Sequence, residues 1–247
     1  MGSTADHGAA LRELLTDVHA VLLDFDGPVT DLFRDQSTAP VAHEIKMAVR
    51  AVWGFVDPEV DACDDSHGIL RLLREMYDRP TPEPLDPRGL LAAEEIVTEY
   101  EYEAVKTAVP APHLIRLVDV LFKHGPPLVI VSNNSDGPIW EFFKGQRVQR
   151  QEKVRAVVGR DPLLRHMKPH PGSVNRALEH LGLPPESALL IGDQLTDLSA
   201  AQQAGTPFLG YTQSRERAAR MLDLGAKYVV PSHEPLIEAV ESVSSLN

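Results

Sequence analysis

The sequence predicts an α/β protein with a doubly wound parallel sheet and an inserted helical domain. Three observations predict this fold: short apolar runs spaced along the chain, helical patterns between them, and one long region without strands. The chain has 247 residues, of which 43% are hydrophobic. That is enough for one sizeable core that carries a smaller insert.

Six short apolar runs are the predicted strands. Each is unbroken rather than alternating, which is typical of strands buried on both faces of a parallel sheet. In chain order they are Val21–Leu23, Leu128–Val131, the weaker Ala156–Val158, Ala188–Ile191, Pro207–Tyr211 and Tyr228–Val230. Helical patterns lie between the later runs, at Leu114–His124, Gly172–Leu181, Asp197–Ala204 and Ser214–Leu224. This alternation of strand and helix predicts the doubly wound core.

The region from residue 33 to residue 110 breaks the alternation. It contains no convincing strand, and we expect helices at Ala42–Phe55, Glu59–Cys63, Gly68–Tyr77 and Pro87–Val109. A proline-rich connector, residues 79–84, separates the last two. We therefore predict a core domain made of residues 1–32 and 111–247 and a helical domain at residues 33–110.

Charge and composition argue against several classes of partner. The net charge of −12 repels phosphate backbones, so we expect no nucleic-acid partner. The apolar stretches are too short to span a bilayer, and the N-terminus lacks the features of a signal peptide. A single cysteine, Cys63, cannot form an intramolecular disulfide. We therefore expect a cytoplasmic protein without a membrane partner.

Two carboxylates close the first predicted strand. Asp24 and Asp26 follow its apolar residues, and Gly27 comes next. Ligand sites of open α/β sheets lie at the carboxyl ends of strands, which is where this pair falls. The two side chains point the same way while the strand continues, although a turn at Gly27 can re-aim Asp26. The alternative is a purely structural Asp-Gly turn.

Polar residues follow the second predicted strand and open a later helix. A hydroxyl and backbone N–H groups at Ser132-Asn133-Asn134 could bind phosphate oxygens, although such a segment is also a generic turn. Lys168 precedes Pro169, which holds it in an extended conformation. It could offer a fixed positive charge to an anion, and the alternative is a solvated surface lysine.

The strand at residues 188–191 leads to further carboxylates. Asp193 follows this strand, and Asp197 stands at the start of the next helix, where it could also be a simple N-cap. Grouped with Asp24 and Asp26, these carboxylates would form an oxygen-rich site suited to Mg²⁺.

Taken together and in this order, the four motifs resemble those of the haloacid dehalogenase-like hydrolase superfamily. Asp24-Phe25-Asp26-Gly27 is similar to its Asp-x-Asp-Gly motif; Ser132, Lys168-Pro169 and Gly192–Asp197 are similar to the other three. The resemblance runs from about residue 18 to about residue 235, and the helical insert looks like the most N-terminal type of cap in that family. Pro28 stands where members often have threonine, which leaves the hydrogen bonding of the turn open.

This resemblance implies a Rossmann-like catalytic core and hydrolysis of a small metabolite's phosphate monoester through an aspartyl-phosphate, with Mg²⁺ as cofactor. It implies that Asp24 is the nucleophile and Asp26 the general acid/base. The implied phosphate-binding residues are Ser132, Asn133 and Lys168. The implied metal-binding residues are Asp24, Asp26 through its backbone carbonyl, and Asp193, with Asp197 orienting a water or Lys168.

Other functions stay open at this level. They are a phosphomutase of the same family, a non-catalytic phosphate- or protein-binding module, and a phospho-accepting signalling domain, which the helical insert fits badly. Family members that are dehalogenases usually lack an aspartate at the position of Asp26, so Asp26 favours phosphate transfer. Lys46, Arg50, Trp53 and His67 are candidate specificity residues of the insert, each with a structural alternative. A homodimer is possible.

Overall fold

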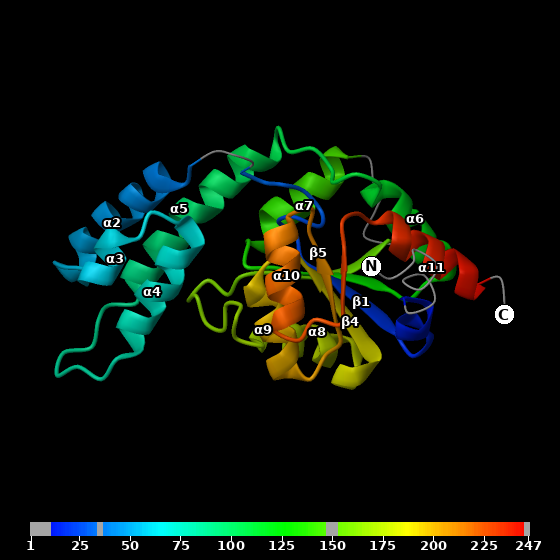
Figure 1. Ribbon diagram of the computed structural model, residues 1–247. Coiled ribbons are helices and arrows are strands. Elements are labelled where there is room, and N and C mark those ends of the chain that lie inside the picture. Colours follow the sequence, from blue (N-terminus) through cyan, green and yellow to red (C-terminus); the bar gives the residue numbers. More distant parts are fainter. Residues whose placement is uncertain (1–10, 34–36, 147–152, 245–247) are drawn as a thin grey trace.

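The computed structural model describes residues 11–33, 37–146 and 153–244 (Figure 1). Within them, parallel strands form one sheet in the order β3-β2-β1-β4-β5-β6. The strands are β1 (Ala20–Leu23), β2 (Leu128–Val131), β3 (Val154–Val158), β4 (Ala188–Gly192), β5 (Phe208–Tyr211) and β6 (Tyr228–Val230). This order confirms the predicted doubly wound α/β fold, and it reverses direction between β1 and β4.

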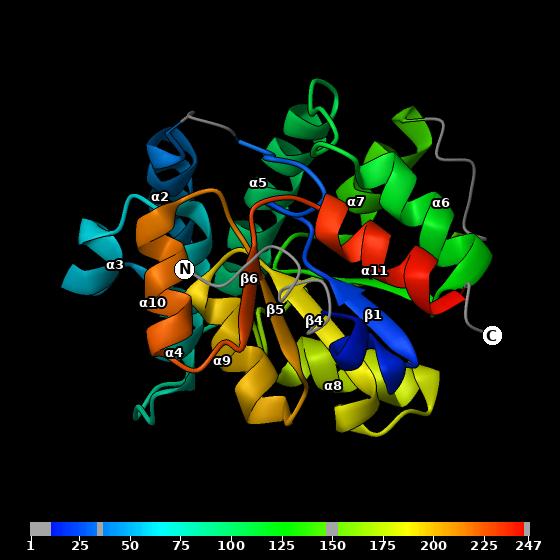
Figure 2. The ribbon, with the colours of Figure 1, turned by 45° about the vertical axis from the view of Figure 1, so that its right-hand side comes forward.

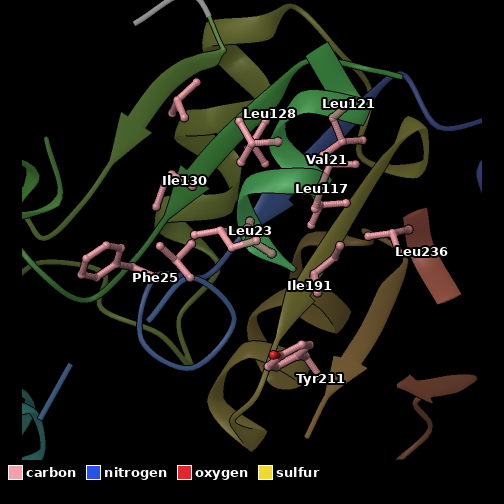
Figure 3. Packing of buried hydrophobic residues seen from close by; sticks show 14 of the residues in the cluster. Val21, Leu23, Phe25, Leu117, Leu121, Leu128, Ile130, Ile191, Tyr211 and Leu236 are labelled. Carbon is pink, nitrogen blue, oxygen red and sulfur yellow. The ribbon is translucent and has the colours of Figure 1, made fainter. Parts of the chain in front are cut away.

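Helices cover both faces of the sheet, and the strands β1, β2 and β4 bury side chains on both sides. Val21 and Leu23 of β1 belong to one apolar cluster, whereas Ala20 and Leu22 belong to another. The first cluster lies under α6 (Leu114–His124), α7 (Asp136–Gly145) and α11 (Glu234–Ser244), and the second under α8 (Gly172–Leu181), α9 (Leu195–Ala204) and α10 (Arg215–Asp223) (Figure 2). Figure 3 shows β1 side chains packed against the α6 residues Leu117 and Leu121.

Helix boundaries mostly match their sequence signals. Gly182 and Gly205 end α8 and α9 in the left-handed conformation, and the Ser214 side chain caps α10 by accepting from the Arg217 N–H. Two helices were not predicted, α7 and α11, and neither was the helical turn at residues 11–16. The first turn of α7 contains a glycine and a proline, which usually mark loops.

The inserted helices are α2 (Ala39–Trp53), α3 (Pro58–Ala62), α4 (Ser66–Asp78) and α5 (Arg88–Val105). They enclose an apolar cluster of their own, separate from the two clusters of the sheet. That cluster also contains Leu164 and Met167, which come from the loop after β3. Figure 1 shows α2, α3 and α4 to one side of the sheet and α5 reaching toward it. The expected helices of this region are therefore present, each shifted by a few residues.

The two chain segments that connect the insert to the sheet run side by side. Thr30 and Pro110 form an isolated bridge, the Thr30 hydroxyl donates to the Val109 carbonyl at 2.8 Å, and the Ala111 N–H donates to the Val29 carbonyl at 2.8 Å. These hydrogen bonds join the chain segment that enters the insert to the segment that leaves it. In the part of the chain that the structure describes, no helix is long and apolar enough to cross a bilayer.

Candidate active site

Three strand ends bring polar side chains together at one edge of the sheet. Asp24 follows β1, Ser132 follows β2 and Asp193 follows β4, and all three side chains are buried. The strands β1 and β4 are paired neighbours at the point where the sheet order reverses. This is the place where open α/β sheets bind ligands.

Asp24, Asp193 and Asp197 form a buried carboxylate cluster, with one oxygen of each within 4.8 Å of the others. Two glycines make this close approach possible. A Cβ at Gly27, which has φ of +102°, would lie 2.5 Å from Asp193 Cγ, and a Cβ at Gly192 would lie 2.5 Å from Asp197 Cγ. Side chains at either position would push the carboxylates apart.

Lys168 lies inside this cluster rather than on the surface. Its ammonium group is 2.7 Å from Asp24 Oδ1 and 2.5 Å from Asp197 Oδ1, and it donates to the Val131 carbonyl at 3.2 Å. Only 3% of the residue is exposed, so a solvated surface lysine is the wrong reading of this position. Burial lowers the pKa of Lys168, but the two carboxylates raise it more strongly and keep the ammonium group charged.

The carboxylates are held close enough to resist ionisation. Burial and the charge of Asp197 raise the pKa of Asp24 to about 7, against the opposing effect of Lys168. Burial, Asp24 and Asp197 raise the pKa of Asp193 to about 8. The pKa of Asp26 is also raised, chiefly by burial. A nearby cation would offset this repulsion and favour the charged carboxylates.

The donor set fits a hard divalent cation. Carboxylate oxygens are the preferred ligands of Mg²⁺. Asp193 Oδ2 accepts from Gln194 Nε2 at 2.6 Å and from Arg217 Nη1 at 2.8 Å, whereas Oδ1 is buried without a hydrogen-bond partner among the described residues. An unpartnered buried carboxylate oxygen beside two other carboxylates suits coordination of a metal ion.

Asp197 and Asn133 both contact Lys168 and hold it in place. Asp197 stands at the third position of α9, not at its N-cap, and its Oδ2 accepts from the Gln194 N–H at 2.9 Å in a capping box. The Asn133 side chain accepts from the Lys168 N–H at 2.8 Å and donates to the Lys168 carbonyl at 3.1 Å. The two residues therefore fix the ammonium group and the backbone of Lys168, respectively.

The turn after β1 aims Asp26 away from the strand. Asp26 Oδ1 accepts from the Leu32 N–H at 2.8 Å, and the Gly27 N–H donates to the Thr30 carbonyl at 2.7 Å. The carbonyl of Pro28 accepts from Nε2 of the buried His233 at 2.6 Å. This turn is thus held by a histidine that lies just before α11.

A cavity of about 490 Å³ opens above these residues and is bounded on its far side by α4. His67 and Arg71, one helical turn apart on α4, line it together with Asp24, Asp26, Ser132, Asn133, Lys168 and Asp197. Arg71 was not predicted, because an arginine within an amphipathic helix has no sequence signal that separates a site residue from a solvated one. Its 46% exposed side chain pairs with Glu75 at 2.7 Å.

The other candidate specificity residues of the insert lie elsewhere and do not line this cavity. Lys46 donates to the Asp61 carbonyl at 2.7 Å, and Arg50 pairs with the Asp61 carboxylate at 2.6 Å. Trp53 stacks near Tyr77 within the apolar cluster of the insert. These three side chains hold the inserted helices to one another.

A buried ion pair joins the insert to the site. Glu101 of α5 and Arg160, which follows β3, have fully buried side chains 2.7 Å apart. Glu101 also accepts from Asn134 Nδ2 at 3.1 Å and from the Ser135 N–H at 2.9 Å, and lies 3.2 Å from His67 Nε2. Burial would raise the pKa of Glu101, but Arg160 and His67 bring it to about 2. Sequence reasoning missed this network, because its charges resemble surface charges.

Comparisons with known proteins agree with this geometry. The family described as haloacid dehalogenase-like hydrolase matches residues 64–211, which include Ser132, Lys168, Asp193 and Asp197. A phosphoglycolate phosphatase of Rhodobacter capsulatus is 28% identical over 196 residues, covering 78% of this chain and 84% of that protein. One from Rhodospirillum rubrum is 29% identical over 127 residues, covering 51% and 52%, so the chain spans about half the length of that relative.

Solved structures show the same fold. A family hydrolase from Deinococcus radiodurans with bound phosphate and sodium superposes with a TM-score of 0.58 at 22% identity, covering 92% of this chain and 96% of that one. CbbY from Rhodobacter sphaeroides in complex with phosphate gives 0.54 at 22% identity, covering 87% and 94%.

The fold and the site together define a doubly wound α/β protein with a carboxylate-rich centre at the switch point of its sheet. Since the family match covers more than half of the chain, the protein belongs to the haloacid dehalogenase-like hydrolase family. Within that family it is an enzyme of the phosphatase type.

Proposed function

We propose that this protein hydrolyses the phosphate monoester of a small carboxylate-bearing metabolite, with Mg²⁺ as cofactor and an aspartyl-phosphate on Asp24 as intermediate. The observation that carries the proposal is the charge arrangement around Lys168. The carboxylates of Asp24, Asp193 and Asp197 outnumber the buried ammonium group of Lys168, and a divalent cation would offset the remaining negative charge. Such a centre can receive a phosphate dianion only with this cationic support.

In the proposed reaction an oxygen of the Asp24 carboxylate attacks phosphorus, and the bond from phosphorus to the ester oxygen breaks. Asp26 gives its proton to the leaving oxygen, which the raised pKa of this carboxyl favours. Asp26 then takes a proton from a water, whose oxygen attacks phosphorus and releases inorganic phosphate from Asp24. Both carboxyl groups return to their starting states.

The surrounding groups have supporting parts in this proposal. Lys168, the Ser132 hydroxyl and the backbone N–H of Asn133 bind phosphate oxygens, while the Asn133 side chain and Asp197 hold Lys168 in place. When bound, Mg²⁺ would supply electrostatic stabilisation of the transferring phosphoryl group, held by Asp24, Asp193 and the backbone carbonyl of Asp26.

The inserted helices, in residues 33–110, are proposed to act as a cap domain that selects the leaving group. Arg71 lines the same cavity as Lys168 and Ser132, which are proposed to bind the phosphate. Its ion pair with the exposed Glu75 contributes little stability, so a substrate carboxylate can replace Glu75 at low cost. A guanidinium group can bind a carboxylate through two parallel hydrogen bonds. The names of the curated relatives, phosphoglycolate phosphatases, support a phosphorylated hydroxy acid as the substrate class.

A phosphate-release assay tests the proposal. The full chain is given a panel of phosphate esters that includes phosphoglycolate, glycerol phosphates and hexose phosphates, with Mg²⁺ or with EDTA. We expect Mg²⁺-dependent release, fastest from a carboxylate-bearing ester. Isomerisation without release would instead indicate a phosphomutase, and no metal-dependent turnover of any ester would indicate a binding module. A cytoplasmic location and a homodimer remain predictions of the sequence.

A further inference from the structure

Arg217 contacts the cluster from an element that none of the four motifs includes. It lies in the first turn of α10, and its Nη1 is 2.8 Å from Asp193 Oδ2. The same nitrogen lies 3.4 Å from the Asp193 carbonyl. It reaches Asp193 through a second cavity, of about 720 Å³, which Asp26, Gly27 and Tyr211 also line.

The two carboxylate oxygens of Asp193 have different contacts. Arg217 and Gln194 both donate to Oδ2, so this oxygen is held from two directions. Gly27 packs against the carboxylate so closely that a Cβ there would overlap it. Oδ1 is left buried and without a partner among the described residues. The carboxylate can therefore present only one oxygen to the cluster.

Repulsion between the buried carboxylates makes it necessary to hold the Asp193 side chain in place. Asp24 and Asp197 each place an oxygen within 4.8 Å of one on Asp193, and like charges at that separation repel strongly in a buried site. Lys168 contacts Asp24 and Asp197. Arg217 supplies the corresponding positive charge for Asp193.

We propose that Arg217 is a positioning residue that holds Asp193 with Oδ1 directed at the metal position, and so sets the affinity for Mg²⁺. This inference rests on the proposed function, because it takes Asp193 to be a metal ligand. Groups that orient metal ligands typically change metal affinity by about 10–100-fold when removed.

The test measures Mg²⁺ binding rather than turnover alone. The dissociation constant is obtained from the Mg²⁺ dependence of the thermal unfolding midpoint for the full chain, Arg217→Met, Arg217→Lys and Arg220→Met. Arg220 is the matched control, because it is exposed, lies one turn further along α10 and does not line the cavity beside Asp193. The Mg²⁺ concentration that gives half-maximal phosphate release is measured in parallel.

We expect Arg217→Met to weaken Mg²⁺ binding by about 10-fold or more, Arg217→Lys to weaken it less, and Arg220→Met to leave it unchanged. Saturating Mg²⁺ should restore most of the rate of Arg217→Met. Unchanged or tighter binding by Arg217→Met would overturn the inference while leaving the proposed function standing. Absence of Mg²⁺ binding by the unsubstituted chain would overturn both.

Discussion

At the scale of single residues, Lys168 decides what the carboxylates around it can do. Its ammonium group touches Asp24 and Asp197 and is itself buried, so neither carboxylate faces the other without a cation between them. Asn133 holds the Lys168 backbone by two hydrogen bonds, which makes the position of that charge rigid. The arrangement concentrates positive charge where a phosphate would meet a nucleophile.

Asp26 offers the first residue-scale prediction. In the proposed mechanism Asp26 gives a proton to the leaving oxygen and then takes one from a water. Asp26→Asn should therefore lower kcat by about 10²–10⁴-fold, the usual contribution of general acid/base catalysis. The fold should persist, since an amide oxygen can still accept from the Leu32 N–H. Steady-state kinetics measure the change, and circular dichroism checks the fold. A variant that kept the original rate would rule out Asp26 as the acid/base.

Gly27 offers a second prediction at the scale of single residues. A methyl group there would displace Asp193, so Gly27→Ala should weaken Mg²⁺ binding by about 10–100-fold. Gly54→Ala is the control: Gly54 also has a positive φ, of +79°, but a Cβ at Gly54 meets nothing within 4 Å. Both variants carry the same type of backbone strain, so equal Mg²⁺ affinities in the two would contradict the steric account.

At the scale of elements, the inserted helices contact two loops of the site. Leu164 and Met167, on the loop that leads to Lys168, pack into the apolar cluster of the insert. Glu101 of α5 pairs with Arg160 and accepts from two residues of the loop after β2. The loops that carry Lys168 and Ser132 are therefore both fixed from the insert side.

The buried pair gives a prediction about stability. Glu101→Ala removes the fully buried one of the two carboxylates that pair with Arg160 and leaves Glu94, 3.1 Å away, as the other. It should therefore lower the free energy of unfolding by about 3 kcal/mol. Glu103→Ala is the matched control, because the Glu103 side chain is 71% exposed and its pair with Lys106 is worth about 1 kcal/mol or less. Denaturant unfolding compares the two. Similar losses in both would refute the role given to the buried pair.

The sequence predicted the elements that depend on local patterns. The strands are unbroken apolar runs, and the four motifs sit where strands or helices begin or end, so the doubly wound fold and the place of the candidate site follow from them. Contacts between distant charges could not be predicted in this way. Arg160 and Glu101 have no sequence pattern that separates them from surface charges, and His233 and Pro28 are 205 positions apart. Arg71 was missed for the same reason, whereas α7 was missed because its first turn contains a glycine and a proline.

At the scale of the whole molecule, the C-terminal part of the chain supports the turn after β1. His233 precedes α11, donates to the Pro28 carbonyl and stacks on Tyr211 at a ring separation of 4.6 Å. Burial is the main cause that lowers the pKa of His233 to about 4. The first and last elements of the core therefore meet at the residue that follows the Asp26-Gly27 pair.

This contact makes stability depend on pH. In the unfolded chain His233 takes up a proton near pH 6.5, and in the native protein only near pH 4. The contribution of the neutral, buried His233 to the free energy of unfolding is complete above pH 6.5. It is lost as the pH falls toward 4, and about 2 kcal/mol of it has been lost at pH 5. The stability difference between the unsubstituted chain and His233→Asn should shrink by that amount between about pH 7.5 and about pH 5. A difference independent of pH would mean that His233 is not neutral and buried.

Formation of a covalent phosphoryl group on Asp24 is the most direct test of the account. The full chain is quenched with acid during turnover of a phosphate ester in Mg²⁺, digested, and analysed by mass spectrometry. We expect the mass of one phosphoryl group on the peptide that contains Asp24, absent with EDTA and absent in Asp24→Asn, which should also release no phosphate. Metal-dependent phosphate release by Asp24→Asn at the original rate would contradict the central claim.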